Sequence, residues 1–205
     1  MKSIVLASGN TGKLREFSQL FGTWEIEVLP QSAFGVPAVQ ETGLSFIENA
    51  LIKARHASRI SGLPALADDS GLAVDALGGA PGIYSARYSG AGATDARNNC
   101  KLLEALRGVE EHLRGASFHC ALAFVRRFDD PVPLVCCAQW RGRILDAPAG
   151  KHGFGYDPLF YVAAEGLTSA QLPQEVKNRL SHRAQALAKF EVIWRQAMLG
   201  ASFAG

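Results

Sequence analysis

The sequence places two acidic residues side by side, Asp68 and Asp69, directly after the apolar segment 64–67. Two neighbouring carboxylates repel each other unless a positive charge lies beside them. Carboxylate oxygens are also the ligands that Mg²⁺ prefers in proteins, usually one or two of them together with phosphate oxygens and water. The pair is therefore a candidate for metal binding and for activating a water molecule. The alternative is an exposed turn, because Asp, Ser and Gly are typical turn residues.

A second candidate is the segment Ser8–Lys13, with the sequence SGNTGK, which follows an apolar strand and opens a predicted helix. Its two glycines allow a sharp turn and a close approach to a ligand. The first amides of a helix and the helix dipole favour an anion, and Lys13 adds a positive charge. The segment therefore suits a polyphosphate. The alternative is a simple turn in which Asn10 or Thr11 caps the helix.

The spacing around Lys13 differs from that of a P-loop. A P-loop needs G-x-x-x-x-G-K followed by Ser or Thr, whereas this chain has G-x-x-G-K followed by Leu14. No hydroxyl follows the lysine to hold Mg²⁺, so acidic ligands must come from elsewhere. Glu41, before a predicted helix, and the Asp pair at a strand end can meet at one edge of a sheet. Asn49 and Lys53 are four residues apart and share a helix face.

A segment rich in glycine and aromatic residues, HGFGYDP at 152–158, suits a nucleobase. An aromatic ring can stack on a base, and Asp157 can accept a hydrogen bond from a base N–H. Arg183 falls on the first turn of the last predicted helix, where its charge opposes the helix dipole unless an anion or a carbonyl oxygen lies nearby. The alternatives are Phe154 in the core, Lys177 as a solvated charge and His182 as a capping or core residue.

These side chains need a framework, and the hydrophobic pattern predicts one. It indicates helices over 11–21, 44–61, 94–107, 173–180 and 183–199. It indicates strands over 2–7, 25–29, 64–68 and 72–76, the last two around a DDSG turn, and a hairpin of 116–128 and 132–146. Loops are predicted over 77–92 and 147–158. Alternating strands and helices with a long hairpin predict an α/β fold around a mixed sheet.

Composition limits the class of protein. The chain has 205 residues and a formal net charge of +2, which is too balanced to predict a nucleic-acid surface. No apolar run approaches the roughly 20 residues of a membrane span. The N-terminal apolar stretch is too short for a signal peptide, so we expect a cytoplasmic protein without membrane contact. The four cysteines lack the spacing of a zinc site and are predicted to be reduced core residues.

Six blocks of the sequence resemble the Ham1 (RdgB) family of noncanonical purine NTP pyrophosphatases, and they occur in the family's order. The blocks are SGNTGK at 8–13, ETGLSFIENALIKAR at 41–55, ALADDSGL at 65–72, GAPGIYSARY at 79–88, GFGYDPLF at 153–160 and KNRLSHRAQAL at 177–187. The resemblance implies an ITPase-like (Maf/Ham1) two-lobed α/β fold in one domain, 1–205. This fold has a long central mixed β-sheet flanked by helices, and a cleft between the lobes.

The resemblance also implies an activity. Members of this family hydrolyse the noncanonical purine nucleoside triphosphates ITP, dITP and XTP to the monophosphate and pyrophosphate. They use Mg²⁺, usually act as homodimers, and keep deaminated purines out of DNA and RNA. By residue-to-residue match, Asp69 resembles the proton acceptor, and Glu41 and Asp69 resemble the metal ligands. The matching substrate-binding residues are Ser8, Gly9, Asn10, Thr11, Gly12, Lys13, Lys53, Ser70, Phe154, Gly155, Tyr156, Asp157, Lys177, His182 and Arg183.

The predicted reaction is attack of water on the α-phosphorus. Charge neutralisation by Mg²⁺ improves pyrophosphate as a leaving group, and an ionised carboxylate accepts the proton of the water. Three alternatives stay open at this point. The first is a Maf-like pyrophosphatase acting on modified pyrimidine nucleotides, the second a phosphate-binding regulatory module without hydrolysis, and the third a P-loop NTPase. The carboxylates argue against the second, and the spacing argues against the third.

Overall fold

The computed structural model describes residues 2–201, which form two compact units. Unit 1 comprises residues 2–69, 121–137 and 187–201, and unit 2 comprises residues 70–120 and 138–186. Three strands, β3 (Ala65–Val74), β4 (Gly115–Val125) and β5 (Leu134–Ile144), contribute residues to both units.

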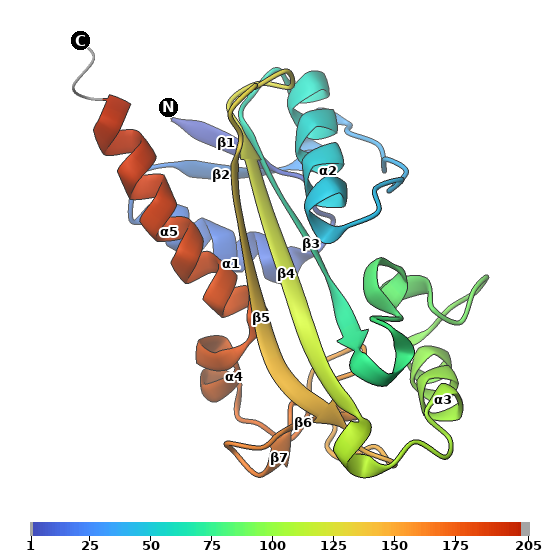
Figure 1. Ribbon diagram of the computed structural model, residues 1–205. Helices are drawn as coiled ribbons and strands as arrows, with labels where there is room; N and C mark the ends of the chain where they lie inside the picture. Colours follow the sequence, from blue (N-terminus) through green and yellow to red (C-terminus); the bar gives the residue numbers. More distant parts are fainter. Residues whose placement is uncertain (1, 202–205) are drawn as a thin grey trace. The chain divides into compact units, whose positions relative to one another are not determined.

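The strands of the described residues form one seven-stranded sheet in the order β2-β1-β3-β4-β5-β6-β7 (Figure 1). The short strands are β1 (Ser3–Leu6), β2 (Glu27–Pro30), β6 (Phe160–Val162) and β7 (Leu167–Thr168). Strand β1 pairs in parallel with β2 and β3, whereas β6 pairs antiparallel with β5 and β7. The predicted α/β fold with a mixed sheet and flanking helices is therefore confirmed.

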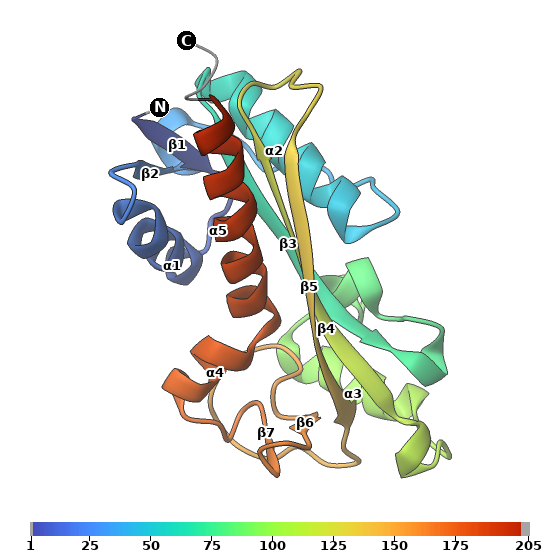
Figure 2. The same cartoon turned by 60° about the vertical axis from the view of Figure 1, so that its left-hand side comes forward.

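In unit 1, helices cover both faces of the sheet (Figure 2). Helix α2 (Phe46–Ser61) lies on one face, where Ala54 and Ala57 pack with Val5 and Val125. Helix α1 (Thr11–Gly22) and the last helix, α5 (His182–Ala201), lie on the other face. Small alanine side chains let α2 approach the strands closely, which brings the side chains at its N-terminal end within reach of β3.

The other face of unit 1 is covered by a cluster of aromatic rings. Phe21 of α1 lies edge-on to Trp194 of α5, with 5.2 Å between ring centroids, and Phe124 of β4 meets the same Trp194 at 4.8 Å. Phe190, one turn earlier in α5, is fully buried beside Phe21. Such offset and edge-to-face pairs add to the stabilisation from burial alone. The cluster therefore fastens both helices to the strands.

Unit 2 holds the 3₁₀ helix η3 (Gly82–Arg87) and two α-helices, α3 (Asp95–Ala105) and α4 (Gln174–Leu180). Its core is built from large apolar side chains of strands and loops, with Leu102 and Leu106 supplied by α3 and its C-cap. The predicted loop 77–92 thus contains a 3₁₀ turn, and the short strands β6 and β7 were not predicted.

One sequence-based prediction about β3 is wrong. The residues 64–68 and 72–76 were expected as two short strands around a DDSG turn, but β3 is one continuous strand of ten residues. Asp68 and Asp69 lie within it and are only 2% and 8% exposed. Strand pairing and ion pairs outweigh the turn propensity of this segment. A carboxylate can be buried in a strand when a cationic partner compensates its charge.

The cysteine prediction is only partly confirmed. All four cysteines are free thiols, but Cys100 and Cys137 are exposed, and of the four only Cys120 is buried. Cys136 and Cys137 are neighbours on β5, where successive side chains point to opposite faces, so the two cannot both face the core.

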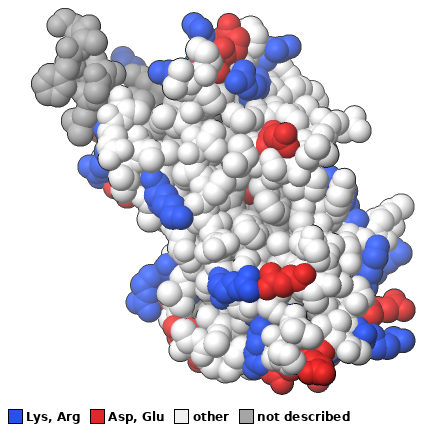
Figure 3. All heavy atoms as spheres, in the orientation of Figure 1, with Lys and Arg blue, Asp and Glu red and all other residues white. Residues whose placement is uncertain are grey.

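The charged surface is mixed in sign. On the face seen in Figure 3, basic and acidic side chains are interspersed among uncharged ones, in keeping with a formal net charge of +2. Within residues 2–201, no helix has the length and apolar character required to cross a membrane.

Phe190→Ala should lower the free energy of unfolding by about 3–5 kcal/mol, because it removes a fully buried ring from the aromatic cluster. Val192→Ala, two residues along the same helix at a side chain 56% exposed, is the matched control and should change it by less than about 0.5 kcal/mol. Urea denaturation followed by tryptophan fluorescence measures both. Equal effects of the two substitutions would contradict the packing described here.

The connection between β4 and β5 depends on one buried carboxylate, Asp130. It accepts hydrogen bonds from Nε and Nη2 of Arg126 at 2.8 and 2.7 Å, and from the backbone amides of Arg126 and Val132 at 3.0 Å each. The side-chain hydrogen bonds from Arg126, aided by the two backbone amides, hold the pKa of Asp130 below its ordinary value of 3.8. The ionised form therefore stabilises the connection.

Asp130→Asn should lower the free energy of unfolding by about 1–3 kcal/mol near neutral pH, because an amide group would turn an N–H toward the Arg126 donors. A lowered pKa in the folded protein means that this stabilisation is complete above the ordinary value of 3.8 and is lost as the pH falls below it. The difference between wild type and variant, measured by urea denaturation, should therefore persist down to about pH 4 and shrink below it. A difference independent of pH would contradict the assignment.

Candidate functional site

The two adjacent aspartates of β3 point to opposite faces of the strand, and each is met by its own lysine. Lys13 Nζ, from the first turn of α1, lies 2.7 and 2.9 Å from the two carboxylate oxygens of Asp68. Lys53 Nζ, from α2, lies 2.6 Å from Oδ1 of Asp69. The alternation of side chains along a strand separates the two carboxylates, so each charge is compensated separately.

Lys53 joins Asp69 to a second carboxylate. Its Nζ also lies 2.9 Å from Oε1 of Glu41. Burial tends to lower the pKa of Lys53, but the charges and hydrogen bonds of the two carboxylates raise it overall. Burial raises the pKa of Asp69 above its ordinary value, and the neighbouring Lys53 offsets this only in part. Asp69 is therefore a stronger base than an exposed aspartate, which suits a group that accepts a proton.

The segment that carries Glu41 is held by the start of α2. The backbone N–H of Gly43 donates to Oδ1 of Asn49 at 2.9 Å, and Nδ2 of the same fully buried Asn49 faces Oδ2 of Asp69 at 3.4 Å. A Cβ on Gly43 would lie 2.5 Å from Cβ of Glu48. Asn49 thus links the Glu41 segment to Asp69, and only glycine fits at position 43.

The side chain of Glu48 forms hydrogen bonds at the N-terminal end of α2. Its Oε2 accepts hydrogen bonds from the Leu44 amide at 2.6 Å and the Ser45 hydroxyl at 3.0 Å, while the Ser45 oxygen accepts from the amide of Glu48. This arrangement resembles a capping box, and the sequence S-x-x-E at 45–48 was a signal for it. Asn49 and Lys53 share a helix face, as predicted, and both contact Asp69.

The SGNTGK segment has the capped turn that was considered as an alternative. The side chain of Asn10 accepts hydrogen bonds from the amides of Gly12 and Lys13 at 2.8 and 3.1 Å, so these two amides already have a partner. Lys13 lines a pocket of about 220 Å³ in unit 1 and brings a positive charge to it. Ser8, Gly9, Glu41, Lys53, Asp68 and residues 37–39 are among those that line it. The side chain of Thr11 lies outside the described part.

The donor set of unit 1 fits a hard divalent cation. Glu41 and Asp69 converge on a single cationic atom, Lys53 Nζ, so the position between them already favours positive charge. Across residues 2–201, no group of three or more His, Cys, Asp or Glu side chains is placed to hold a metal ion. Mg²⁺ usually takes only one or two protein carboxylates and completes its coordination with phosphate oxygens and water. The residues present therefore fit a metal that binds together with a phosphorylated ligand.

In unit 2, the loop 153–157 exposes an aromatic ring. Phe154 is 61% exposed, and Lys177 Nζ lies 5.7 Å from the centre of its ring. Asp157 turns inward, where it accepts hydrogen bonds from the Phe154 amide at 2.9 Å and the Ser169 hydroxyl at 2.8 Å and pairs with Lys177. The alternative of Phe154 as a core residue is therefore excluded.

Other predicted residues of unit 2 support this loop or lie on the last helix. The phenol of Tyr156 is buried and donates to the carbonyl oxygen of Ser85 at 2.8 Å. Ser181 accepts a hydrogen bond from the amide of Ala184 and so caps α5. On the first turn of that helix, the His182 ring stacks on Phe118 with 5.0 Å between ring centroids, and Arg183 is half-buried. Ser70, the residue after Asp69 on β3, is also half-buried.

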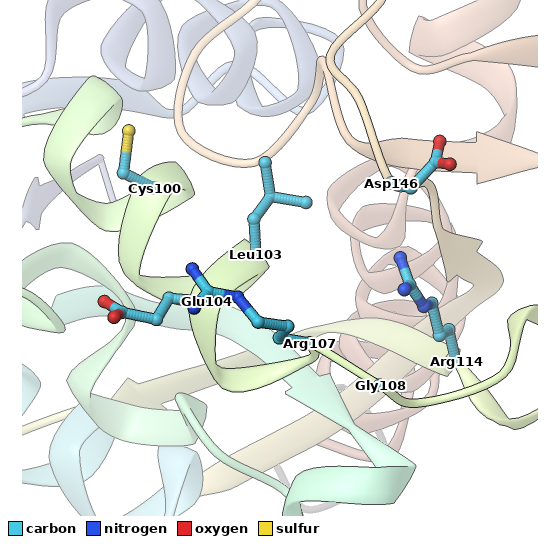
Figure 4. Close-up of a pocket in the computed structure, with 7 residues that line it drawn as sticks. All are labelled: Cys100, Leu103, Glu104, Arg107, Gly108, Arg114 and Asp146. Atoms are coloured by element: carbon cyan, nitrogen blue, oxygen red, sulfur yellow. The ribbon is translucent and has the colours of Figure 1, made fainter.

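Unit 2 also has a larger and more open pocket of about 540 Å³, which none of the predicted site residues lines (Figure 4). Cys100, Leu103, Glu104 and Arg107 reach it from α3 and its C-terminal end. The guanidinium of Arg114 is held there by the carbonyl oxygen of Val109, at 2.9 Å from Nε.

Comparisons with known proteins show the family of this chain. A family model described as the Ham1 family matches residues 4–193. The dITP/XTP pyrophosphatase of Shigella flexneri is 57% identical over 187 residues, which cover 91% of this chain and 95% of that protein. The dITP/XTP pyrophosphatase of Yersinia pseudotuberculosis is 58% identical over 187 residues, which again cover 91% of this chain and 95% of that protein. The solved structure of a HAM1 protein from Coxiella burnetii has a TM-score of 0.92 and 50% identity, and the match covers 96% of this chain and 100% of that one.

Asn49→Asp should lower the free energy of unfolding by about 2 kcal/mol or more near neutral pH, because it keeps an oxygen for Gly43 but turns a second carboxylate toward Asp69. Like charges raise the pKa of one member of such a pair, so the variant should regain stability as the pH falls toward about 5. Urea denaturation as a function of pH measures this. Asn49→Ala, which adds no charge, is the control, and a similar gain in that variant would contradict the assigned contact.

Proposed function

Because the chain belongs to the Ham1 family, we propose that it hydrolyses the noncanonical purine nucleoside triphosphates ITP, dITP and XTP to the monophosphate and pyrophosphate. The observation that carries the proposal is the cluster of Glu41, Lys53 and Asp69 in a protein 57% identical to a dITP/XTP pyrophosphatase. In the cell this activity would remove deaminated purines from the nucleotide pool.

In this proposal Glu41 and Asp69 hold Mg²⁺, and Asp69 accepts the proton of the attacking water. When bound, Mg²⁺ would neutralise charge on the phosphates and make pyrophosphate a better leaving group. Burial raises the pKa of Asp69, and a bound Mg²⁺ would favour its ionised form, which is the form that accepts a proton. Lys53, which touches both carboxylates, keeps them oriented and adds positive charge for the phosphates.

Lys13 and the Ser8–Lys13 segment would bind the triphosphate. The Lys13 side chain is 19% exposed, so it would reach a phosphate while its ammonium stays near Asp68. Asp68 then has a role of its own, because it fixes the lysine at the pocket rather than binding the metal. With Asn10 as the helix cap, side-chain charge would supply most of the affinity for phosphate in this segment.

The residues of unit 2 would recognise the base. The exposed ring of Phe154 can stack on a purine, and Lys177 beside it adds positive charge. Since Asp157 is engaged inside the loop, we assign it to support of the loop instead of to a direct contact with the base. Inosine and xanthosine carry a carbonyl oxygen at position 6, where a donor from Arg183 or His182 would favour them over adenosine.

Further properties implied by the family stay predictions. These are a homodimer, a cytoplasmic location, and one functional domain over 1–205. The alternative of a Maf-like enzyme for modified pyrimidines differs from the proposal in its substrates, and a P-loop NTPase differs in releasing orthophosphate. A panel of substrates in which both pyrophosphate and orthophosphate are measured therefore separates all three activities.

The test is release of pyrophosphate from ITP, XTP, GTP, ATP and dTTP, with and without Mg²⁺. We expect Mg²⁺-dependent release of pyrophosphate from ITP and XTP. Asp69→Asn should lower kcat by about 10²–10⁴-fold, the range for loss of a general base. Asp146→Asn, at an exposed carboxylate of unit 2, is the matched control and should leave kcat unchanged.

Three results would contradict the proposal. Release of orthophosphate would move the attack away from the α-phosphorus. A preference for dTTP would overturn the assignment of the base. Near wild-type turnover by Asp69→Asn would remove Asp69 from its assigned role.

A further inference from the structure

The backbone of Gly155 is held on both sides by α3. Its N–H donates to Oδ2 of Asp95 at 2.6 Å, and its carbonyl oxygen accepts from Nδ2 of Asn99 at 2.8 Å. Asp95 and Asn99 are one helical turn apart and therefore lie on the same face of α3. Sequence reasoning did not connect either residue with Gly155, because Gly155 lies 56 or 60 positions further along the chain.

These contacts fix the residue before Gly155, which is the exposed Phe154. The direction of its side chain depends on the two peptide groups that flank its Cα. Asp157 holds the N–H of the preceding peptide, and Asp95 holds the N–H of the following one. The ring is 61% exposed and has Lys177 Nζ 5.7 Å from its centre. These backbone contacts help to orient it, because they fix the backbone dihedrals that limit its rotamers.

Helix α3 is a firm support for this purpose. Thr94 caps it by accepting a hydrogen bond from the Arg97 amide, and Leu102 is fully buried. Asn98, also buried, accepts from the Ser89 amide at 2.8 Å and donates to the carbonyl oxygens of Ser85 and Ala86. The helix is thus tied to the core and to the segment that also receives the Tyr156 hydroxyl.

We propose that Asp95 and Asn99 are positioning residues that preset the Phe154 ring for stacking on the purine base. This inference rests on the proposed function. An oriented ring loses less conformational freedom when the base binds, so the benefit appears as affinity and not as the rate of the chemical step. The 2.6 Å contact to an ionised carboxylate is of the charge-assisted type, which is the stronger kind of hydrogen bond.

The experiment compares Asp95→Ala, Asn99→Ala and the conservative Asp95→Asn with wild type. Glu104→Gln is the matched control, because Glu104 is exposed on the α3 face that lines the separate pocket in Figure 4. The readouts are kcat and KM with ITP and, independent of catalysis, the Kd for inosine monophosphate by calorimetry. Thermal unfolding and amide hydrogen exchange of residues 153–157 show whether each variant is folded and whether the loop is loosened.

Both alanine variants should raise KM and Kd about tenfold, equal to 1.4 kcal/mol of binding free energy, while kcat at saturation stays close to wild type. Their loop amides should exchange faster while the rest of the protein stays protected. Asp95→Asn keeps an acceptor oxygen for the Gly155 amide but lacks the charge that strengthens the hydrogen bond, so it should restore part of the affinity. Glu104→Gln should match wild type in all readouts.

Folded alanine variants with unchanged KM and Kd would overturn the positioning role, as would a fall in kcat alone. Equal losses in Asp95→Asn and Asp95→Ala would also overturn it, since the helix dipole rather than the hydrogen bond would then explain the effect. If wild type releases no pyrophosphate from ITP, the proposed function fails instead, and the hydrogen-exchange comparison still decides whether α3 orders the loop.

Discussion

The structure depends on the burial of two adjacent carboxylates in the middle of a strand. Leaving water is costly for an ionised group unless a partner of opposite charge replaces the lost hydration. Here the strand geometry sends Asp68 and Asp69 to opposite faces, so one cation cannot serve both. The fold meets this demand with Lys13 from α1 and Lys53 from α2. The positions of both helices relative to β3 therefore determine how the two buried charges are compensated as well as how the core packs.

Because of this arrangement, a few residues make up the candidate site of unit 1. Lys53 compensates Asp69 and Glu41 together, and Asn49 links the backbone near Glu41 to Asp69. The same contacts hold the carboxylates in place, while burial keeps the pKa of Asp69 above its ordinary value. A buried charge network is rarely the most stable choice for a protein interior, and its retention here fits the general trade of stability for activity. Its supporting groups are therefore as constrained as the carboxylates.

Sequence reasoning succeeded where the signal was local. The periodicity of 44–61 predicted α2, and the four-residue spacing of Asn49 and Lys53 predicted their shared face. It failed where partners far along the chain decide the outcome. The Asp-Ser-Gly segment has strong turn propensity, but strand pairing and two lysines overrode it. Glu48 is the intermediate case, because its capping contacts are local and the S-x-x-E spacing encodes them.

In each unit, one glycine lies against a polar side chain that supports the candidate site. A Cβ on Gly43 would meet Glu48 at 2.5 Å, and one on Gly153 would meet Oδ2 of Asp157 at 2.1 Å. Neither glycine carries a functional group, and at Gly153 the backbone φ of +83° also disfavours any other residue. The side chains that pack against these positions, Asn49 and Asp157, are ones that hold reactive or exposed groups in place. In each unit, the candidate site thus requires a glycine backbone that can approach the supporting polar side chain closely.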